Sequence, residues 1–165
     1  MKGKFIISVV SEDKKGLLNQ LTSVFNKRNY EMESLNVSRT DISTIVLITI
    51  EAFLPVDEVQ NTLFKLERFI EVYKARADAA QENIQRKIGF FSVSKDILTS
   101  SYWALIQKYG ASITALSENA VLLEKTGTDA DILELYNQLD STYLLGFCKT
   151  NLIMEKSMTH IQGLF

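Results

Sequence analysis

The sequence has little of the residue types on which disulfide-rich and metal-binding proteins depend. Among 165 residues there is one cysteine, Cys148, and one histidine, His160. A single cysteine excludes an internal disulfide framework and is compatible with a reducing compartment. One cysteine and one histidine also cannot by themselves form a zinc site. We therefore expect a cytoplasmic chain without a structural metal.

The chain also lacks a charge excess and a long apolar run. Its formal net charge is -2 and its isoelectric point is near 5.5, so no global positive field favours nucleic acid or a membrane surface as partner. No stretch approaches the ~18 apolar residues that a membrane-spanning helix needs. The apolar run near the N-terminus is too short for a secretory signal, and we interpret it as a first strand.

No constellation of catalytic residues is visible in the sequence. There is no G-x-x-x-x-G-K-[ST] phosphate loop, and we cannot place the arginine-bearing cradle of acylphosphatase-like chemistry. His160 lies in a segment with a weak structural signal, which makes it a poor general base. Trp103 could be a partner anchor, a core residue or part of a dimer interface. Cys148 follows the apolar Phe147 and is interpreted as a small packed residue.

A repeated order of elements is what the sequence does contain. Hydrophobic periodicity predicts strand, helix, strand, strand, helix and strand in the first half, and the same order in the second. The first set covers residues 5–10, 15–28, 32–39, 45–50, 55–68 and 70–77. The second covers residues 88–93, 102–109, 113–117, 121–126, 132–139 and 144–152, with Gly110 as a left-handed helix cap. No residue-level repeat accompanies this repeat of pattern.

This order predicts an α+β protein of two tandem ferredoxin-like (βαββαβ) domains, each an antiparallel sheet with helices on one face. We expect the domains at residues 1–78 and 86–165, joined by a polar connector at 79–85 that could be helical, with a weakly patterned tail at 155–165. Each sheet would have one uncovered face and unpaired edges. A homodimer is therefore expected.

The segment 11–37, SEDKKGLLNQLTSVFNKRNYEMESLNV, resembles the acetolactate synthase small-subunit family. In that family an acidic-polar loop follows a strand, a glycine opens a leucine-rich helix, and a basic-aromatic turn leads into a Glu-Ser-Leu strand. A weaker similarity continues through residues 64–72, and the chain length and order of elements extend it over nearly the whole chain. The matching residues are Glu12 with Asp13, Gly16 with Leu17 and Leu18, Phe25, Arg28 with Tyr30, and Glu33-Ser34-Leu35.

The resemblance implies two tandem ACT-type domains and a regulatory role without an active site. Such a subunit binds the thiamine-diphosphate-dependent large subunit, raises its activity, and transmits feedback inhibition by a branched-chain amino acid, usually valine, bound between paired N-terminal domains. It implies no cofactor on this chain, since thiamine diphosphate, Mg²⁺ and FAD belong to the large subunit. Two alternative hypotheses are a free-standing amino-acid sensor and an enzyme on a ferredoxin-like scaffold.

The expected effector-binding residues are Asp13, Gly16, Leu17 and Glu31. Backbone N–H groups at a helix N-terminus near Gly16 can face the carboxylate of an amino acid, although glycine there could also serve only the turn. The family commonly has asparagine where this chain has Asp13 and Glu31. A carboxylate would repel the effector's carboxylate and could attract its ammonium. Lys14 is expected to be solvated.

Overall fold

The computed structural model describes residues 1–80, 85–139, 143–150 and 153–154. These residues divide into two compact units, the first formed by residues 1–80 with 154 and the second by the described residues from 85 to 153. Most of the expected connector, the predicted tail at 155–165 and His160 lie outside the described residues.

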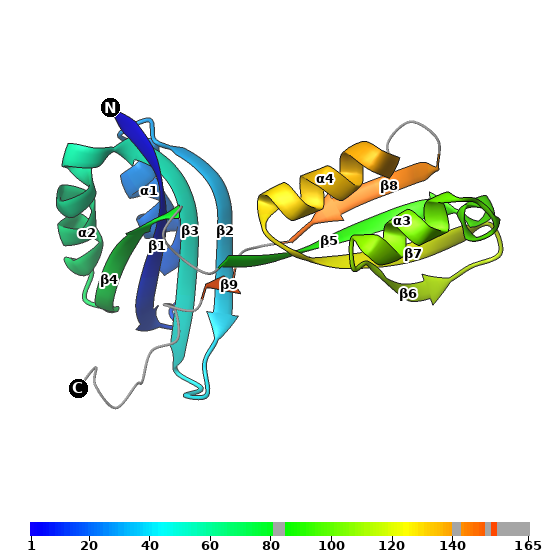
Figure 1. Cartoon of the computed structure of the whole chain (residues 1–165). Coiled ribbons are helices and arrows are strands. Elements are labelled where there is room, and N and C mark those ends of the chain that lie inside the picture. The colour runs from blue at the N-terminus through cyan, green and yellow to red at the C-terminus, as the bar shows by residue number, and fades with distance from the viewer. Residues whose placement is uncertain (81–84, 140–142, 151–152, 155–165) are drawn as a thin grey trace. The chain divides into compact units, whose positions relative to one another are not determined.

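The first unit is a four-stranded antiparallel sheet with two helices on one face (Figure 1). The strand order is β2-β3-β1-β4, which leaves β2 and β4 at the edges. A short 3-10 turn, η1 (Val56–Glu58), precedes the second helix. In chain order the other elements are β1 (Lys2–Glu12), α1 (Leu17–Asn26), β2 (Glu31–Arg39), β3 (Ile45–Pro55), α2 (Val59–Glu67) and β4 (Val72–Ala79).

Helical spacing of apolar residues explains how α1 binds the sheet. Leu17, Leu21 and Phe25 recur on one face and are buried in the core between helices and strands. Pro55 was expected to open the second helix, but it ends β3 with extended backbone (φ -60°, ψ 136°). Proline fixes φ without excluding a strand end, and helical geometry begins only after it.

The sheet face opposite the helices is more polar, and its central part is buried as well. Ser8, Thr49 and Glu51 are at most 7% exposed. The Glu51 carboxylate accepts a hydrogen bond from the Ser34 hydroxyl and lies 3.3 Å from the Lys4 ammonium. A buried carboxylate needs such compensation, since burial of an unpaired charge is costly.

The second unit repeats the arrangement with strand order β6-β7-β5-β8 and a short strand, β9 (Ile153–Met154), paired with β5. The strand-helix-strand-strand-helix-strand order is present twice, which confirms the predicted pair of ferredoxin-like folds. Gly110 has φ +66°, as expected of a left-handed cap. The elements are β5 (Gln85–Ser94), η3 (Lys95–Thr99), α3 (Tyr102–Lys108), β6 (Ser112–Leu116), β7 (Ala120–Gly127), α4 (Asp129–Leu139) and β8 (Leu144–Lys149).

Two side chains singled out by the sequence are now placed. Trp103 is partly buried against the core of the second unit. Cys148 was expected to be packed, and that prediction is wrong because the thiol is exposed. The ring of its neighbour Phe147 makes a tilted contact with Phe91 and an edge-to-face contact with Tyr136, on the face of the sheet that the helices cover. Successive strand residues alternate between faces, so Cys148 lies on the opposite face of an edge strand.

Candidate effector-binding site

The loop between β1 and α1, together with the first residue of α1, contains three of the four expected site residues. The backbone N–H of Asp13 donates to the carbonyl of Thr44 (2.9 Å), and that of Leu17 donates to the carbonyl of Lys14 (3.2 Å). Gly16, between them, has φ +87° and ψ -16°. Only glycine adopts this left-handed conformation without a steric penalty.

The space around Gly16 is open. A Cβ added at this position would meet no atom within 4 Å, so a ligand can approach the backbone there. No side chain caps α1 and no acidic residue lies in its first turn. The positive end of this helix is therefore not neutralised by its own residues, which favours an anion. Leu17 is only 3% exposed, so any contact it makes with a ligand would come from its backbone.

Two contacts connect the loop between β1 and α1 to Glu71, the residue just before β4. The Lys14 ammonium lies 2.6 Å from a carboxylate oxygen of Glu71, and the N–H of Glu12 donates to the Glu71 carbonyl (2.9 Å). The hydrogen bond to Lys14 lowers the pKa of Glu71, and the same bond raises the pKa of Lys14. Lys14 was expected to be solvated, and its side chain is 60% exposed; it also forms an ion pair that holds the loop beside Glu71.

An arginine that the sequence analysis did not single out lies beside Asp13. The Arg39 guanidinium is 3.7 Å from the Asp13 carboxylate, and the two side chains are 82% and 46% exposed. Both Ser11 on β1 and Arg39 on β2 pair with Val46 of β3. The expected strand order places the ends of these strands near one another, but only the register in the structure brings Arg39 to Asp13.

Glu31 lies at the other end of the same sheet. It pairs with Phe53, whereas Arg39 pairs with Val46. Seven steps along β3 at roughly 3.3 Å each separate these positions by about 23 Å. Within one copy, the structure therefore brings Asp13, Gly16 and Leu17 together with Arg39 but leaves Glu31 apart. Glu31 stands at the start of β2, which is an edge strand.

Across the described ranges, no cluster of three histidine, cysteine, aspartate or glutamate residues could hold a metal ion. None of the described helices is long and apolar enough to cross a membrane.

Comparison with known proteins gives consistent matches. Residues 5–68 match the ACT domain. The chain is 26% identical over 138 residues to the acetolactate synthase small subunit of Bacillus subtilis, covering 82% of this chain and 80% of the relative. The small subunit of Haemophilus influenzae is 28% identical over 143 residues, covering 72% and 88%.

A relative from Buchnera aphidicola, also an acetolactate synthase small subunit, is 23% identical over 164 residues, which is 97% of this chain and 96% of the relative. The crystal structure of the Thermotoga maritima small subunit superposes with a TM-score of 0.81 at 17% identity, covering 92% of this chain and 95% of that one. That likeness shows that the two-unit fold is shared. The matches extend over both units: the chain is similar to acetolactate synthase small subunits along most of its length, and its first unit matches the ACT domain.

Proposed function

We propose that this chain is the regulatory, non-catalytic subunit of an acetolactate synthase in branched-chain amino acid biosynthesis, and that it acts in the cytoplasm. It binds the catalytic large subunit and raises its activity. The observation that carries this proposal is the similarity to acetolactate synthase small subunits along most of the length of both chains. The match to the ACT domain supports the same proposal, because the open space at Gly16 could receive a small effector.

The effector site is completed by a second copy. β2 is an edge strand of its sheet, and an edge strand can pair with the β2 of another copy. In antiparallel pairing about a two-fold axis, the start of one β2 lies beside the end of the other. Glu31 of the second copy would then lie near Asp13, Gly16 and Arg39 of the first. This arrangement accounts for the separation of Glu31 from the loop within one copy.

A branched-chain amino acid, valine first among them, fits the chemistry of such a site. Its carboxylate would receive hydrogen bonds from the first turn of α1 near Gly16 and charge from Arg39. Its ammonium would lie between Asp13 and Glu31 of the second copy. Because Arg39 offsets only part of this negative charge, we expect weaker valine binding than in relatives with asparagine at these positions.

Regulation follows if the dimer has two states. Binding to the large subunit preorganises the catalytic site, and an effector that binds one state of the regulatory dimer more tightly shifts the population toward less activation. The size of the inhibition is limited by the ratio of the effector's affinities for the two states.

The test is acetolactate formation by the purified large subunit encoded with this chain, with and without this protein, across a valine titration. Activation followed by valine inhibition supports the whole proposal. Activation without inhibition would refute the proposal that valine is the effector, and would indicate that the carboxylates of Asp13 and Glu31 prevent its binding. No activation and no binding would contradict the subunit role and favour a free-standing sensor.

A further inference from the structure

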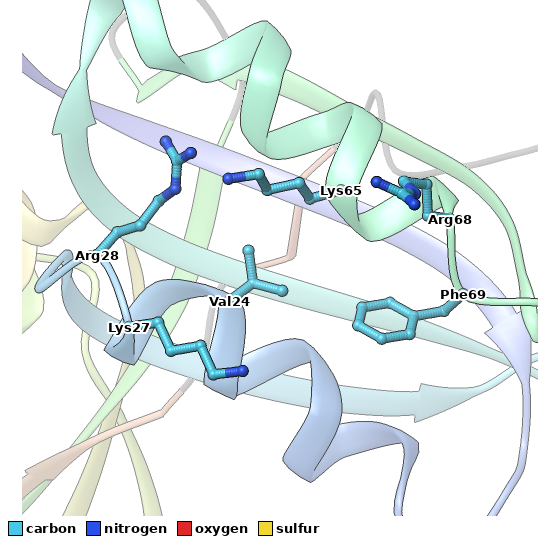
Figure 2. A pocket seen from close by; sticks show the side chains of 6 residues that line it. All are labelled: Val24, Lys27, Arg28, Lys65, Arg68 and Phe69. Atoms are coloured by element: carbon cyan, nitrogen blue, oxygen red, sulfur yellow. The ribbon is translucent and has the colours of Figure 1, made fainter.

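The two helices of the first unit enclose a basic groove that the effector site does not use. A cavity of about 300 Å³ lies between α1 and α2 (Figure 2). A second cavity of about 260 Å³ adjoins it through shared lining residues and extends toward the middle of α1. The basic groove is lined by Val24, Lys27, Arg28, Lys65, Arg68 and Phe69.

The lining contains four cations and no carboxylate. The guanidinium of Arg28 is neutralised from outside the lining by Glu58 and also donates to the Tyr30 hydroxyl. Within the described residues, the side chains of Lys27, Lys65 and Arg68 have no ion pair. In a chain with net charge -2, this is a local concentration of positive charge that attracts an anionic partner.

Cations near helix C-termini also stabilise the helix dipole, and Lys65 in the last turn of α2 has that effect. The dipole does not account for the apolar surface beside the charges. Phe64 is 66% exposed and Ile70 is 95% exposed, and Phe69 in the groove packs against the core only in part. Apolar side chains interleaved with arginine and lysine are typical of a protein interface.

The extent of the basic groove favours a peptide segment over a small anion. The cations lie at or just after the C-terminal ends of two helices, and the adjoining cavity continues past them among polar side chains such as Asn19 and Ser23. One phosphate or carboxylate could not contact both the cations and the apolar side chains of Val24 and Phe69. An extended or helical segment that carries several carboxylates and an apolar anchor could.

We propose that the basic groove is a docking surface for an acidic segment of the catalytic large subunit. Carboxylates of that segment pair with Lys27, Lys65 and Arg68, and an apolar side chain lies on Phe69 and Val24. This inference rests on the proposed subunit role and adds to it the surface that meets the partner. The cations from α1 lie at its C-terminal end, whereas the effector loop opens its N-terminal end, about 15 Å away for a ten-residue helix.

The test is a charge reversal with a matched control. The groove variant carries Lys27→Glu, Lys65→Glu and Arg68→Glu. The control variant carries Lys74→Glu, Lys95→Glu and Lys108→Glu, three exposed lysines outside the groove, and has the same change in net charge. Affinity for the purified large subunit is measured together with acetolactate formation, at several salt concentrations.

We expect the groove variant to bind at least about tenfold more weakly, and the control to stay within about twofold of wild type. Wild-type affinity should fall as salt rises, and the groove variant should lose most of that dependence. If the groove variant loses ordered structure by circular dichroism, Lys27→Gln with Arg68→Gln replaces it, with an expected loss of about threefold.

The outcomes separate the two proposals. Wild-type protein that activates the large subunit, together with a groove variant that binds equally well, overturns the docking surface and leaves the subunit role standing. Wild-type protein that neither binds nor activates overturns the subunit role, and the docking surface with it. A groove variant that keeps its affinity for the large subunit but changes its mass in light scattering shows an interface between copies, which also overturns the proposal.

Discussion

Replacing Asp129 with asparagine should destabilise the second unit more than any single surface ion pair could explain. Asp129 is the first residue of α4, and its two carboxylate oxygens lie 2.7 Å from the ammonium groups of Lys87 and Lys149. The Lys87 side chain is only 3% exposed, whereas that of Lys149 is 42% exposed. Asparagine would leave the Lys87 charge buried without its carboxylate partner.

The expected loss of unfolding free energy can be calculated from the pKa of Asp129. Burial alone would raise this pKa, but hydrogen bonds and charge from Lys149 and Lys87 outweigh it and lower the pKa from 3.8 to about 2. At about 1.4 kcal/mol per pKa unit, this corresponds to roughly 2.5 kcal/mol before screening. Since the carboxylate is 35% exposed, we discount it to about 1–2 kcal/mol. Asparagine removes both ion pairs at once, so we expect the variant to lose about this amount of stability.

The sign of the pH dependence follows from the lowered pKa. The stabilisation is fully present above pH 3.8 and is lost as the pH falls toward 2, because protonated Asp129 no longer pairs with either lysine. The difference in unfolding free energy between wild type and Asp129→Asn should therefore be constant above about pH 4 and shrink below it. Urea denaturation at a series of pH values measures the difference, and hydrogen exchange assigns it to the second unit.

Lys149→Gln is the matched control, because it removes only the more exposed of the two ion pairs. We expect it to cost less than about 1 kcal/mol. If Asp129→Asn costs no more than Lys149→Gln, or if its effect persists unchanged down to pH 2, the assignment of this stability to the buried Lys87 pair is wrong.

Four further substitutions test the site and the packing. Gly16→Ala should lower the unfolding free energy, measured by urea denaturation, by about 1–2 kcal/mol because Gly16 has a positive φ. An unchanged unfolding free energy would contradict the left-handed conformation of Gly16. Glu31→Asn should strengthen valine binding in calorimetry and Arg39→Gln should weaken it; unchanged affinities would refute our account of the site's charge. Gly89→Ala would bring a Cβ to 2.8 Å from Ile132 and should cost about 1–3 kcal/mol, seen as a lower midpoint of thermal unfolding.

Much of the fold could be predicted from residue spacing. The strand at 32–39 and the α1 helix were expected within two or three residues of where they occur, since alternation and the 3.6-residue period reflect which face is buried. Pro55 was misplaced because proline is compatible both with a strand end and with a first helical turn. Local sequence does not choose between the two, and the pairing of β3 with β1 does.

The candidate site was predicted only in part. Asp13, Gly16 and Leu17 are neighbours in sequence, so a motif could find them together. Arg39 could not be found in this way, because it reaches Asp13 only through the register of β2 on β3. The basic groove was missed for the same reason, since its cations lie near the C-terminal ends of two helices that are separated in the chain by two strands.

By itself, the sequence determined the order of elements, the tandem repeat and the resemblance to acetolactate synthase small subunits, because these depend on local periodicity and on a short contiguous motif. Only the tertiary structure decided which distant residues meet. Strand register placed Arg39 beside Asp13 and set Glu31 about 23 Å away along β3. Helix packing gathered Lys27 with Lys65 and Arg68 around one groove. Side-chain chemistry is encoded residue by residue, but the distances that make it a site are set by contacts between elements far apart in the chain.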